Sequence, residues 1–278
     1  MVRIITDSSV LYTEEEAKAA GFDAVPLRVH IGELEGRDLQ MDMEDFYKRI
    51  EAGQIPRSSQ PPVGEVAALY EKYPDSDIIN ISIADGLSGT YQGACCAKDM
   101  IEHPEKITVF NSQTLCGPHR YMAERAKQMA EDGQGRAEIL DWLEQAAKKT
   151  ESFLIPQDFS FLKRGGRLTP VAAAFGSVLR LKPVMKLTED GTRIDKFAVK
   201  RTMSSAVDSI MDYMKKAGVG SRHILYIAHA RALEDAKKIQ KMMERTFEGL
   251  KIHILELSPV FVAQGGPKCV AIQYIERF

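Results

Sequence analysis

The sequence predicts an α/β protein of two α/β domains, with a mostly parallel sheet in the first domain and a mixed sheet in the second. In the first half of the chain, short apolar runs alternate with amphipathic runs of helical period, which is typical of βαβ units. In the second half, a hairpin pattern surrounds Asp190-Gly191, and a final apolar run is expected to pair antiparallel with a neighbour. The 278 residues suffice for two hydrophobic cores, and we expect domains at 1–150 and 151–278.

In the first domain, buried apolar runs predict strands at 2–6, 23–31, 77–83 and 106–112. Amphipathic runs predict helices at 13–21, 42–53, 62–73, 119–133 and 136–150, and a further helix that begins at Tyr91. Thr13 and Glu16 have the spacing of a capping box, and Gly21 suits the end of the same helix.

In the second domain, strands are expected at 152–156, 223–230, 251–257 and 268–276, with the hairpin at 181–200. Helices are expected at 170–180, 203–218 and 233–247. The segment 160–169 is interpreted as a turn because it is rich in glycine and positive charge. Two α/β domains without a low-complexity linker predict a cleft between them, and ligand sites favour such interfaces.

Composition excludes several classes of function. The formal net charge is −2 and no long basic run occurs, so general affinity for nucleic acid is not expected. No apolar run reaches the roughly 18 residues of a membrane span, so stable membrane insertion is not expected either. The four cysteines lack Cys-x-x-Cys spacing, which favours reduced thiols in a cytoplasmic protein. The histidines are scattered, and no metal site is predicted.

Ser88 is the most conspicuous candidate functional residue, because it lies where a predicted strand turns into a helix. The nucleophile elbow of α/β-hydrolases has the pattern Gly-x-Ser-x-Gly, and here the second glycine, Gly89, comes one place too early. No histidine has a recognisable triad context. Ser88 or Thr90 instead suits a helix cap, and the same hydroxyls with the free N–H groups of a helix N-terminus suit an anion.

Hydroxyl-bearing residues follow strands at three further places. These are the segments "TDSS" (6–9), "RSSQPP" (57–62) and "NSQT" (111–114). The carboxyl ends of parallel strands share one edge of the sheet, where open α/β folds bind ligands. Four such turns together predict a pocket for an anion or a hydroxyl-bearing ligand.

The segment "LKRGGRL" (162–168) has neither a P-loop nor the Gly-x-Gly-x-x-Gly spacing, so kinase activity and dinucleotide binding have no motif support. Its cations can clamp an anion, dock an acidic partner or lie in a solvated turn; they are Lys163, Arg164 and Arg167. The apolar helix predicted at 170–180 carries small side chains, which indicates either a tightly packed core helix or room for an apolar ligand tail.

Several segments together resemble the DegV family of bacterial fatty-acid-binding proteins. The matching segments appear in the family's order along the whole chain: "TDSSVLYTEE" (6–15), "RSSQPPVGE" (57–65), "ISIADGLSGTYQGA" (81–94), "VFNSQTLCG" (109–117), "FLKRGGRL" (161–168), "LKPVM" (181–185), "KRT" (200–202) and "SPVFVAQGGP" (258–267). Each segment alone is weakly specific, whereas the ordered set is highly specific.

The resemblance implies two α/β domains with one long-chain fatty acid between them and the acyl chain directed into the second domain. It implies that hydroxyls of two turns hold the carboxylate. Carried onto this chain, those residues are Ser58 and Ser88, with Ser59, Gly89 and Thr90 nearby.

Some members of the family are the lipid-binding subunit of fatty acid kinase and present the carboxylate to a separate ATP-using subunit. The resemblance therefore implies a carrier that is not itself an enzyme, has no catalytic residue and needs no cofactor, and that we expect to be a monomer. A basic patch including Arg201 and Arg167 is the expected dock for the kinase subunit.

The sequence departs from the family's pattern at two places. Pro62 stands where the family has a further hydroxyl, and Gln264 stands where the family has a histidine that can contact the carboxylate. Gln264 can donate a hydrogen bond but cannot become cationic. Ser58, Ser88 and Gln264 are then neutral donors, and each buried CH₂ of an acyl chain contributes about 0.8 kcal/mol to binding.

Three hypotheses follow from the sequence. The first is a fatty-acid carrier for a kinase partner. The second is a serine hydrolase or acyltransferase that uses Ser88. The third is a binder of another amphipathic carboxylate, redirected by the change at Gln264.

Overall fold

The computed structural model describes residues 2–174 and 181–278, which form two compact units, Met1–Lys148 and Lys149–Phe278. The domain boundary expected after residue 150 falls two residues beyond this division. Each unit contains its own sheet covered by helices, so the α/β class predicted from the alternation of apolar and amphipathic runs is confirmed.

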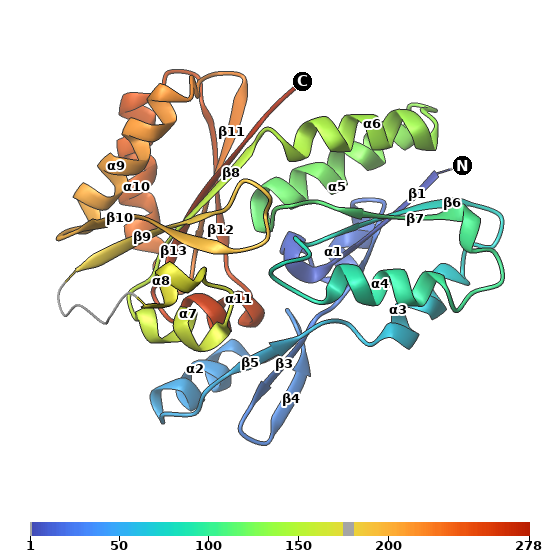
Figure 1. Ribbon diagram of the computed structural model, residues 1–278, viewed down its shortest axis with the longest axis horizontal. Helices are drawn as coiled ribbons and strands as arrows, with labels where there is room; N and C mark the ends of the chain where they lie inside the picture. Colours follow the sequence, from blue (N-terminus) through green and yellow to red (C-terminus); the bar gives the residue numbers. More distant parts are fainter. Residues whose placement is uncertain (1, 175–180) are drawn as a thin grey trace. The chain divides into compact units, whose positions relative to one another are not determined.

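The main sheet of the first unit is parallel throughout, as predicted. Its strand order is β2-β1-β6-β7 (Figure 1), and every neighbouring pair runs in the same direction. The strands are β1 (Val2–Asp7), β2 (Asp23–Val25), β6 (Asp77–Ser82) and β7 (Ile107–Asn111). The carboxyl ends of these strands therefore meet at one edge, where the candidate site is built.

Helices α1 (Glu14–Ala19), α3 (Val63–Tyr70) and α4 (Thr90–Lys98) lie between these strands in sequence, and α5 (Cys116–Glu131) and α6 (Arg136–Ala147) follow β7. Short 3₁₀ turns occur at Ser8–Val10 and Pro104–Lys106. Buried side chains of α3 and α4 pack with Ile5 and Ile78 on one face of the sheet. The capping box of Thr13 and Glu16 is present, and Gly21 ends α1 with φ of 91°, as the sequence predicted.

The first unit also contains a three-stranded antiparallel sheet that the sequence did not predict. Its order is β4-β3-β5, and its strands are β3 (Arg28–Ile31), β4 (Leu34–Arg37) and β5 (Arg57–Ser59). Helix α2 (Met43–Glu51) lies between β4 and β5 in sequence. The single strand expected at 23–31 is wrong. Pro26, which has no N–H to donate, lies between β2 and β3, and the two strands belong to different sheets.

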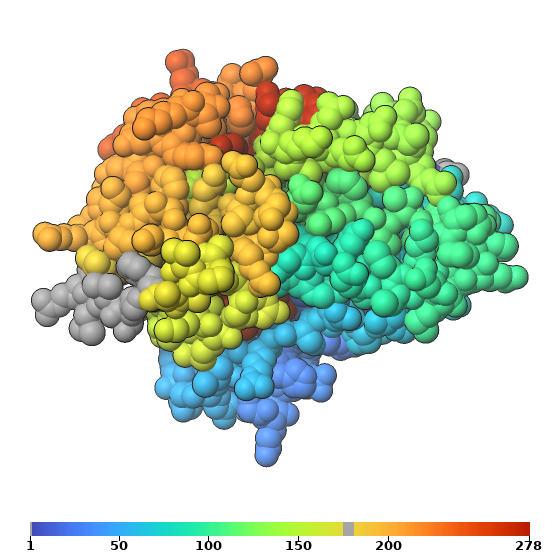
Figure 2. All heavy atoms as spheres, viewed as in Figure 1, coloured from blue at the N-terminus to red at the C-terminus, as the bar shows by residue number. Residues whose placement is uncertain are grey.

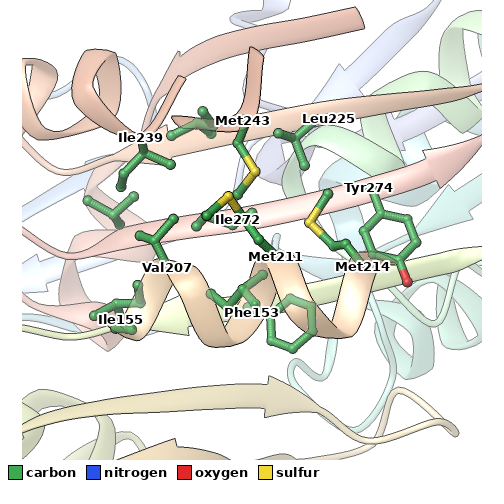
Figure 3. Packing of buried hydrophobic residues seen from close by; sticks show 14 of the residues in the cluster. Phe153, Ile155, Val207, Met211, Met214, Leu225, Ile239, Met243, Ile272 and Tyr274 are labelled. Atoms are coloured by element: carbon green, nitrogen blue, oxygen red, sulfur yellow. The ribbon is translucent and has the colours of Figure 1, made fainter. Parts of the chain in front are cut away.

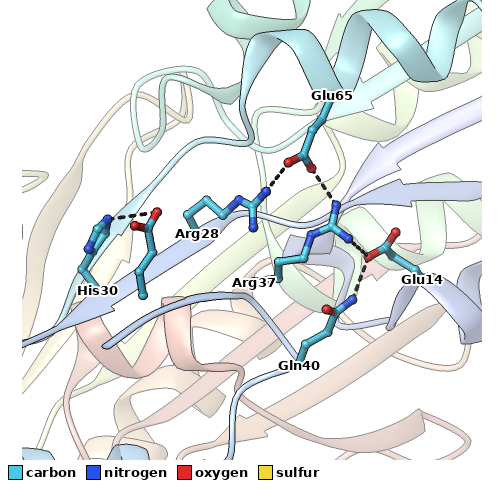
Figure 4. Close-up of polar contacts among 7 residues, drawn as sticks. Glu14, Arg28, His30, Arg37, Gln40 and Glu65 are labelled. Carbon is cyan, nitrogen blue, oxygen red and sulfur yellow. Dashed lines mark hydrogen bonds and ion pairs between the residues drawn. The ribbon is translucent and has the colours of Figure 1, made fainter. Parts of the chain in front are cut away.

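The β3–β4 hairpin is linked to the helices by a network of ion pairs (Figure 4). Glu65 of α3 accepts from both Arg28 and Arg37, and Arg37 also donates to Glu14 of α1 over 3.0 Å. These side chains are partly exposed, so each pair contributes little energy but restrains where the base of the hairpin lies. The exposed hairpin tip at 32–35 is part of the blue projection in Figure 2.

The second unit contains a six-stranded mixed sheet, also as predicted. Its order is β10-β9-β8-β13-β11-β12, in which β11 and β12 are parallel and the other pairs are antiparallel. The strands are β8 (Thr150–Ile155), β9 (Lys182–Leu187), β10 (Ile194–Lys200), β11 (His223–His229), β12 (Lys251–Glu256) and β13 (Val270–Glu276). The hairpin around Asp190-Gly191 and the antiparallel final strand are both confirmed.

Helices α9 (Met203–Lys216) and α10 (Leu233–Thr246) cover one face of this sheet. Their buried residues pack against alternate residues of the strands in one continuous core (Figure 3), including Val207, Met214, Ile239, Phe153 and Ile272. Strand residues that alternate with these, such as Leu154 and Met185, pack instead with α7 (Phe159–Gly165) and α8 (Pro170–Ala174).

The turn predicted at 160–169 is wrong. Residues Phe159–Gly165 form helix α7, in which Asp158 caps the N-terminus by accepting from the N–H of Ser160. Gly166 ends the helix with φ of 73°, a conformation in which glycine has no steric penalty. The C-terminal helix α11 (Pro259–Gly265) was not predicted. Of the helix predicted at 170–180, Pro170–Ala174 are described as α8, and residues 175–180 lie outside the described residues.

We expect Ile239→Ala to lower the free energy of unfolding by about 2–5 kcal/mol, because it removes a fully buried side chain and leaves a cavity. Leu233→Ala, in the first turn of the same helix, is the matched control. Leu233 is 44% exposed, so its loss should cost less than about 1 kcal/mol. Urea unfolding followed by circular dichroism measures both values, and equal losses would contradict this account of the core.

Candidate functional site

Three strands of the parallel sheet end in hydroxyl-bearing turns on the same edge. Ser8 and Ser9 follow β1, Ser88 and Thr90 follow β6, and Ser112 follows β7; these three strands are neighbours. The fourth turn does not belong to this set, because Ser58 and Ser59 lie in β5 of the antiparallel sheet. The expectation of four converging strand ends is therefore wrong in its geometry.

The Ser88 hydroxyl is engaged at the start of α4. Its Oγ lies 2.8 Å from Oγ1 of Thr90 and accepts a hydrogen bond of 3.3 Å from the Thr90 backbone N–H. The helix begins at Thr90, one residue before the predicted start, and the N-cap position itself is Gly89. Ser88 thus caps the helix from the residue before the N-cap position. Among the described residues, the partner of its half-buried hydroxyl is Thr90 and not a histidine that could act as a catalytic base.

Strand geometry separates Ser58 from Ser59, because successive side chains of a strand point to opposite faces. Ser58 is paired with Val29, which is fully buried, and Ser58 is half-buried itself. Ser59 is exposed and is paired with Arg28, the arginine that contacts Glu65. Of the two serines, Ser58 is the one on the face of the strand that contacts the core.

Gln60 brings this strand next to the Ser88 turn. Its side-chain amide lies against the backbone of α4 where Gly89 and Gly93 leave space, and a Cβ at Gly93 would lie 2.8 Å from its Nε2. A Cβ at Gly89 would overlap its Oε1. The segment "RSSQPP" (57–62) and the Ser88 turn are therefore in contact, and the absence of a side chain at both glycines leaves the space that Gln60 fills.

A buried polar network lies behind the same edge. His119 of α5 has no exposed surface; its Nδ1 lies 2.8 Å from Ser9 Oγ and its Nε2 lies 3.0 Å from the carbonyl oxygen of Ile81. A carbonyl only accepts, so Nε2 carries the proton and Nδ1 accepts from Ser9. Burial lowers the pKa of His119, against the opposing effects of Asp7 and the Ile81 carbonyl, so the ring is held neutral.

The remaining predicted residues lie in the second unit. Gln264 is half-buried in α11, and its side-chain oxygen lies against Gly165 of α7, where any larger residue would overlap it. Arg167 is half-buried and donates to the carbonyl oxygen of Gly165. Arg201 is exposed and immediately precedes Thr202, which caps α9.

The described residues contain neither a membrane-spanning helix nor a metal-binding cluster. No helix among them is long and apolar enough to cross a membrane. Nowhere in residues 2–174 and 181–278 do three or more His, Cys, Asp or Glu side chains come together as a group that could hold a metal ion.

The fold and the edge of its first sheet define an α/β protein whose candidate ligand-binding groups are neutral hydroxyls and amides. A family model described as "Uncharacterised protein, DegV family" matches residues 1–277, and the chain belongs to the DegV family. The resemblance inferred from the ordered motifs is thereby confirmed.

Relatives cover nearly the whole chain. Protein DegV of Bacillus subtilis is 30% identical over 244 residues, 86% of each chain, and a DegV domain-containing protein of Halalkalibacterium halodurans is 29% identical over 283 residues, 99% of each. The crystal structure of DegV, a fatty acid binding protein from Bacillus subtilis, is similar with a TM-score of 0.87 and 26% identity. A DegV family protein from Thermus thermophilus, described by its fatty acid binding, has a TM-score of 0.87 and 25% identity; both matches cover 99% of each chain.

Three contributors to this region are not predicted from the sequence: Gln60, the buried pair of Asp7 with Ser8, and His119. Gln60 lies within the segment "RSSQPP", where the serines are the predicted ligand-binding residues. The glycines at positions 89 and 93, one helical turn apart, are the signal for a side chain packed on α4. No sequence signal pairs Asp7 with Ile83, 76 positions away, or Ser8 with Leu27 and Asp38, which are 19 and 30 positions away.

The buried neutral His119 predicts a loss of stability in acid. The unfolded chain binds a proton near pH 6.5, whereas the lowered pKa keeps the folded ring neutral, so stability is complete above about pH 6.5 and falls as the pH drops below it. His119→Gln keeps one acceptor and one donor. We expect it to flatten the dependence between about pH 5 and 6.5 by up to about 1.4 kcal/mol per pH unit.

Fluorescence of Trp142, the single tryptophan, measures unfolding of the first unit in this test. His103→Gln, at an exposed position of the same unit, is the control and should keep the pH dependence of the unaltered protein. An unchanged slope in His119→Gln would show that the ring is not held neutral.

Proposed function

We propose that this protein binds a long-chain fatty acid and holds its carboxylate with neutral donors, chiefly the hydroxyls of Ser58 and Ser88. The observation that carries the proposal is the contact of Gln60 with Gly89 and Gly93, which sets the strand of Ser58 beside the Ser88 turn. Membership of the DegV family supports the ligand class, because the similar proteins from Bacillus subtilis and Thermus thermophilus bind fatty acids.

The local electrostatics suit a carboxylate. The Ser88 turn stands at the N-terminus of α4, a helix of nine residues whose first N–H groups and dipole favour negative charge. Thr90 is buried and its hydroxyl lies 2.8 Å from that of Ser88, so Thr90 orients the Ser88 hydroxyl. Gly89 leaves the approach to the turn open to the Gln60 side chain.

Ser59 has a lesser role in this proposal than Ser58, because it is exposed on the opposite face of β5. Gln264 stays a predicted further donor, and its contact with Gly165 restrains its side chain. Neutral donors tolerate both the ionised and the protonated acid, and the affinity then comes mainly from the acyl chain, at about 0.8 kcal/mol per buried CH₂.

We further propose that the protein is a carrier rather than an enzyme, without a cofactor, and that it presents the bound acid to a separate kinase subunit in the cytoplasm. Arg201 and Arg167 are the proposed docking residues. Arg201 is exposed beside the cap of α9, which suits contact with a partner surface. Nothing in this role requires more than a monomer.

The first experiment identifies the ligand. Mass spectrometry of lipid extracted from the native, full-length protein should detect a long-chain fatty acid at close to one molecule per chain. A different amphipathic carboxylate would favour the redirected binder instead, and a folded sample without lipid that also takes up no added fatty acid would reject the proposal.

The second experiment tests Ser88. Ser88→Ala removes one hydroxyl donor, so retention of fatty acid should weaken by about tenfold, the value of roughly one hydrogen bond. Ser76→Ala, just before the opposite end of β6, is the matched control and should retain fatty acid normally. Hydrolysis of acyl esters by the unaltered protein that is lost in Ser88→Ala would support the hydrolase hypothesis instead.

The third experiment tests docking. Arg201→Ala should lower phosphorylation of the bound fatty acid by the kinase subunit while leaving the lipid content unchanged. Arg245→Ala, an exposed arginine of α10, is the control for loss of one positive charge. If Arg201→Ala and Arg245→Ala support phosphorylation equally well, the docking role of Arg201 is wrong.

A further inference from the structure

We propose that Asp7 and Ser8 are positioning residues for the two sides of the carboxylate site: Asp7 for the Ser88 turn and Ser8 for the strand that carries Ser58. This inference rests on the proposed function. Both residues are almost completely buried, each with 2% exposure, so they act through other groups and do not touch the ligand.

Asp7 joins the end of β1 to the start of the Ser88 turn. One carboxylate oxygen, Oδ2, accepts from the backbone N–H of Ile83 over 2.9 Å, and the other, Oδ1, accepts from the N–H of Ser9 over 2.9 Å. Ile83 is the first residue after β6, and the chain then turns so that the N–H of Ser88 bonds to the carbonyl of Ala84. The Asp7 carboxylate therefore determines where that turn begins.

Ser8 joins the same end of β1 to both ends of the β3–β4 hairpin. Its Oγ accepts from the N–H of Leu27 over 3.1 Å and donates to Oδ2 of Asp38 over 2.8 Å. Leu27 immediately precedes β3, Asp38 immediately follows β4, and the Asp38 N–H donates to the Leu27 carbonyl. One hydroxyl thus fixes the base of the hairpin.

The hairpin carries this restraint to Ser58, because β3 is the central strand of its sheet and pairs Val29 with Ser58. The ion pairs of Arg28 and Arg37 with Glu65 restrain the same hairpin from the side of α3 (Figure 4), but they are partly exposed. The Ser8 contacts are buried, where a hydrogen bond is stronger and its loss leaves unpaired groups. Two adjacent residues in β1 and its exit therefore set the spacing of the Ser58 and Ser88 hydroxyls.

The test compares a free acid with its ester, because positioning of a carboxylate clamp matters only to the acid. Delipidated full-length protein is titrated with palmitic acid and with methyl palmitate. Asp7→Asn replaces one acceptor oxygen by an amide donor, and Ser8→Ala removes the hydroxyl. In each variant, we expect palmitic acid to bind about tenfold more weakly and the ester to change by less than about twofold.

Ser82→Ala is the matched control. Ser82 is fully buried at the end of β6, and its hydroxyl donates to Asn80 of the same strand over 3.1 Å rather than to a group of the Ser88 turn or of the hairpin. This variant should lose some stability and keep the preference for the acid. If Asp7→Asn does not fold, Ser8→Ala tests the positioning role alone, since it adds no new atoms to the core.

If a variant lost affinity for palmitic acid and for methyl palmitate by the same factor, the substitution would have weakened the whole binding site, and the positioning role would be overturned. Variants that keep the full preference for the acid would also overturn it, while the proposed function would stand. If the unaltered protein itself bound neither compound, or did not prefer the acid, the proposed carboxylate site would fail first.

Discussion

The parallel pairing of β1 with β6 is the constraint on which the first unit depends. Parallel strands require crossover connections, and here α1, the antiparallel sheet β4-β3-β5 and α3 all lie between these two strands in sequence. The same pairing brings the residues after β1 and after β6 to a common edge. Asp7 can bond to Ile83 only because the two strands end side by side.

Burying polar side chains at this edge of the sheet costs free energy that apolar side chains in the same places would not cost. Asp7, Ser8, Ser9, Asp38 and His119 are all buried, and each is paired with a backbone or side-chain group. Unpaired, each would cost several kcal/mol. Such a network specifies one arrangement of the turns around it, because alternatives leave donors facing donors.

Much of the fold was predictable from the sequence because its signals are local. The capping box at Thr13 and Glu16, the glycine that ends α1 and the Asp190-Gly191 hairpin each lie within a few residues of chain. Where prediction was wrong, the cause was also physical. Residues 23–31 are mostly apolar and have no strong turn signal besides Pro26, and only tertiary pairing assigns their two ends to different sheets. Helix α7 depends on the Asp158 cap, which the glycine and charge content of the segment obscured.

The candidate site was predictable as a set of motifs but not as a geometry. Ser58 and Ser59 are adjacent in sequence, and only the pairing of β5 with β3 shows that they face opposite ways. The contact between Gln60 and α4, like the bond from Ser8 to Asp38, joins residues about 30 positions apart. The two glycines indicate that some side chain packs on α4, but no pattern within the chain identifies Gln60 as that side chain or pairs Ser8 with Asp38.

The packing of Gln60 on α4 links three positions that are otherwise independent in sequence. Gly89 and Gly93 are small because a long amide fills the space above them, and Gln60 is long because that space exists. A side chain added at either glycine would displace the Gln60 amide or need a shorter residue at position 60, and a shorter residue there would leave a void beside the helix start. The three positions therefore form one packing unit, in which the side chain that fits at one position depends on the other two.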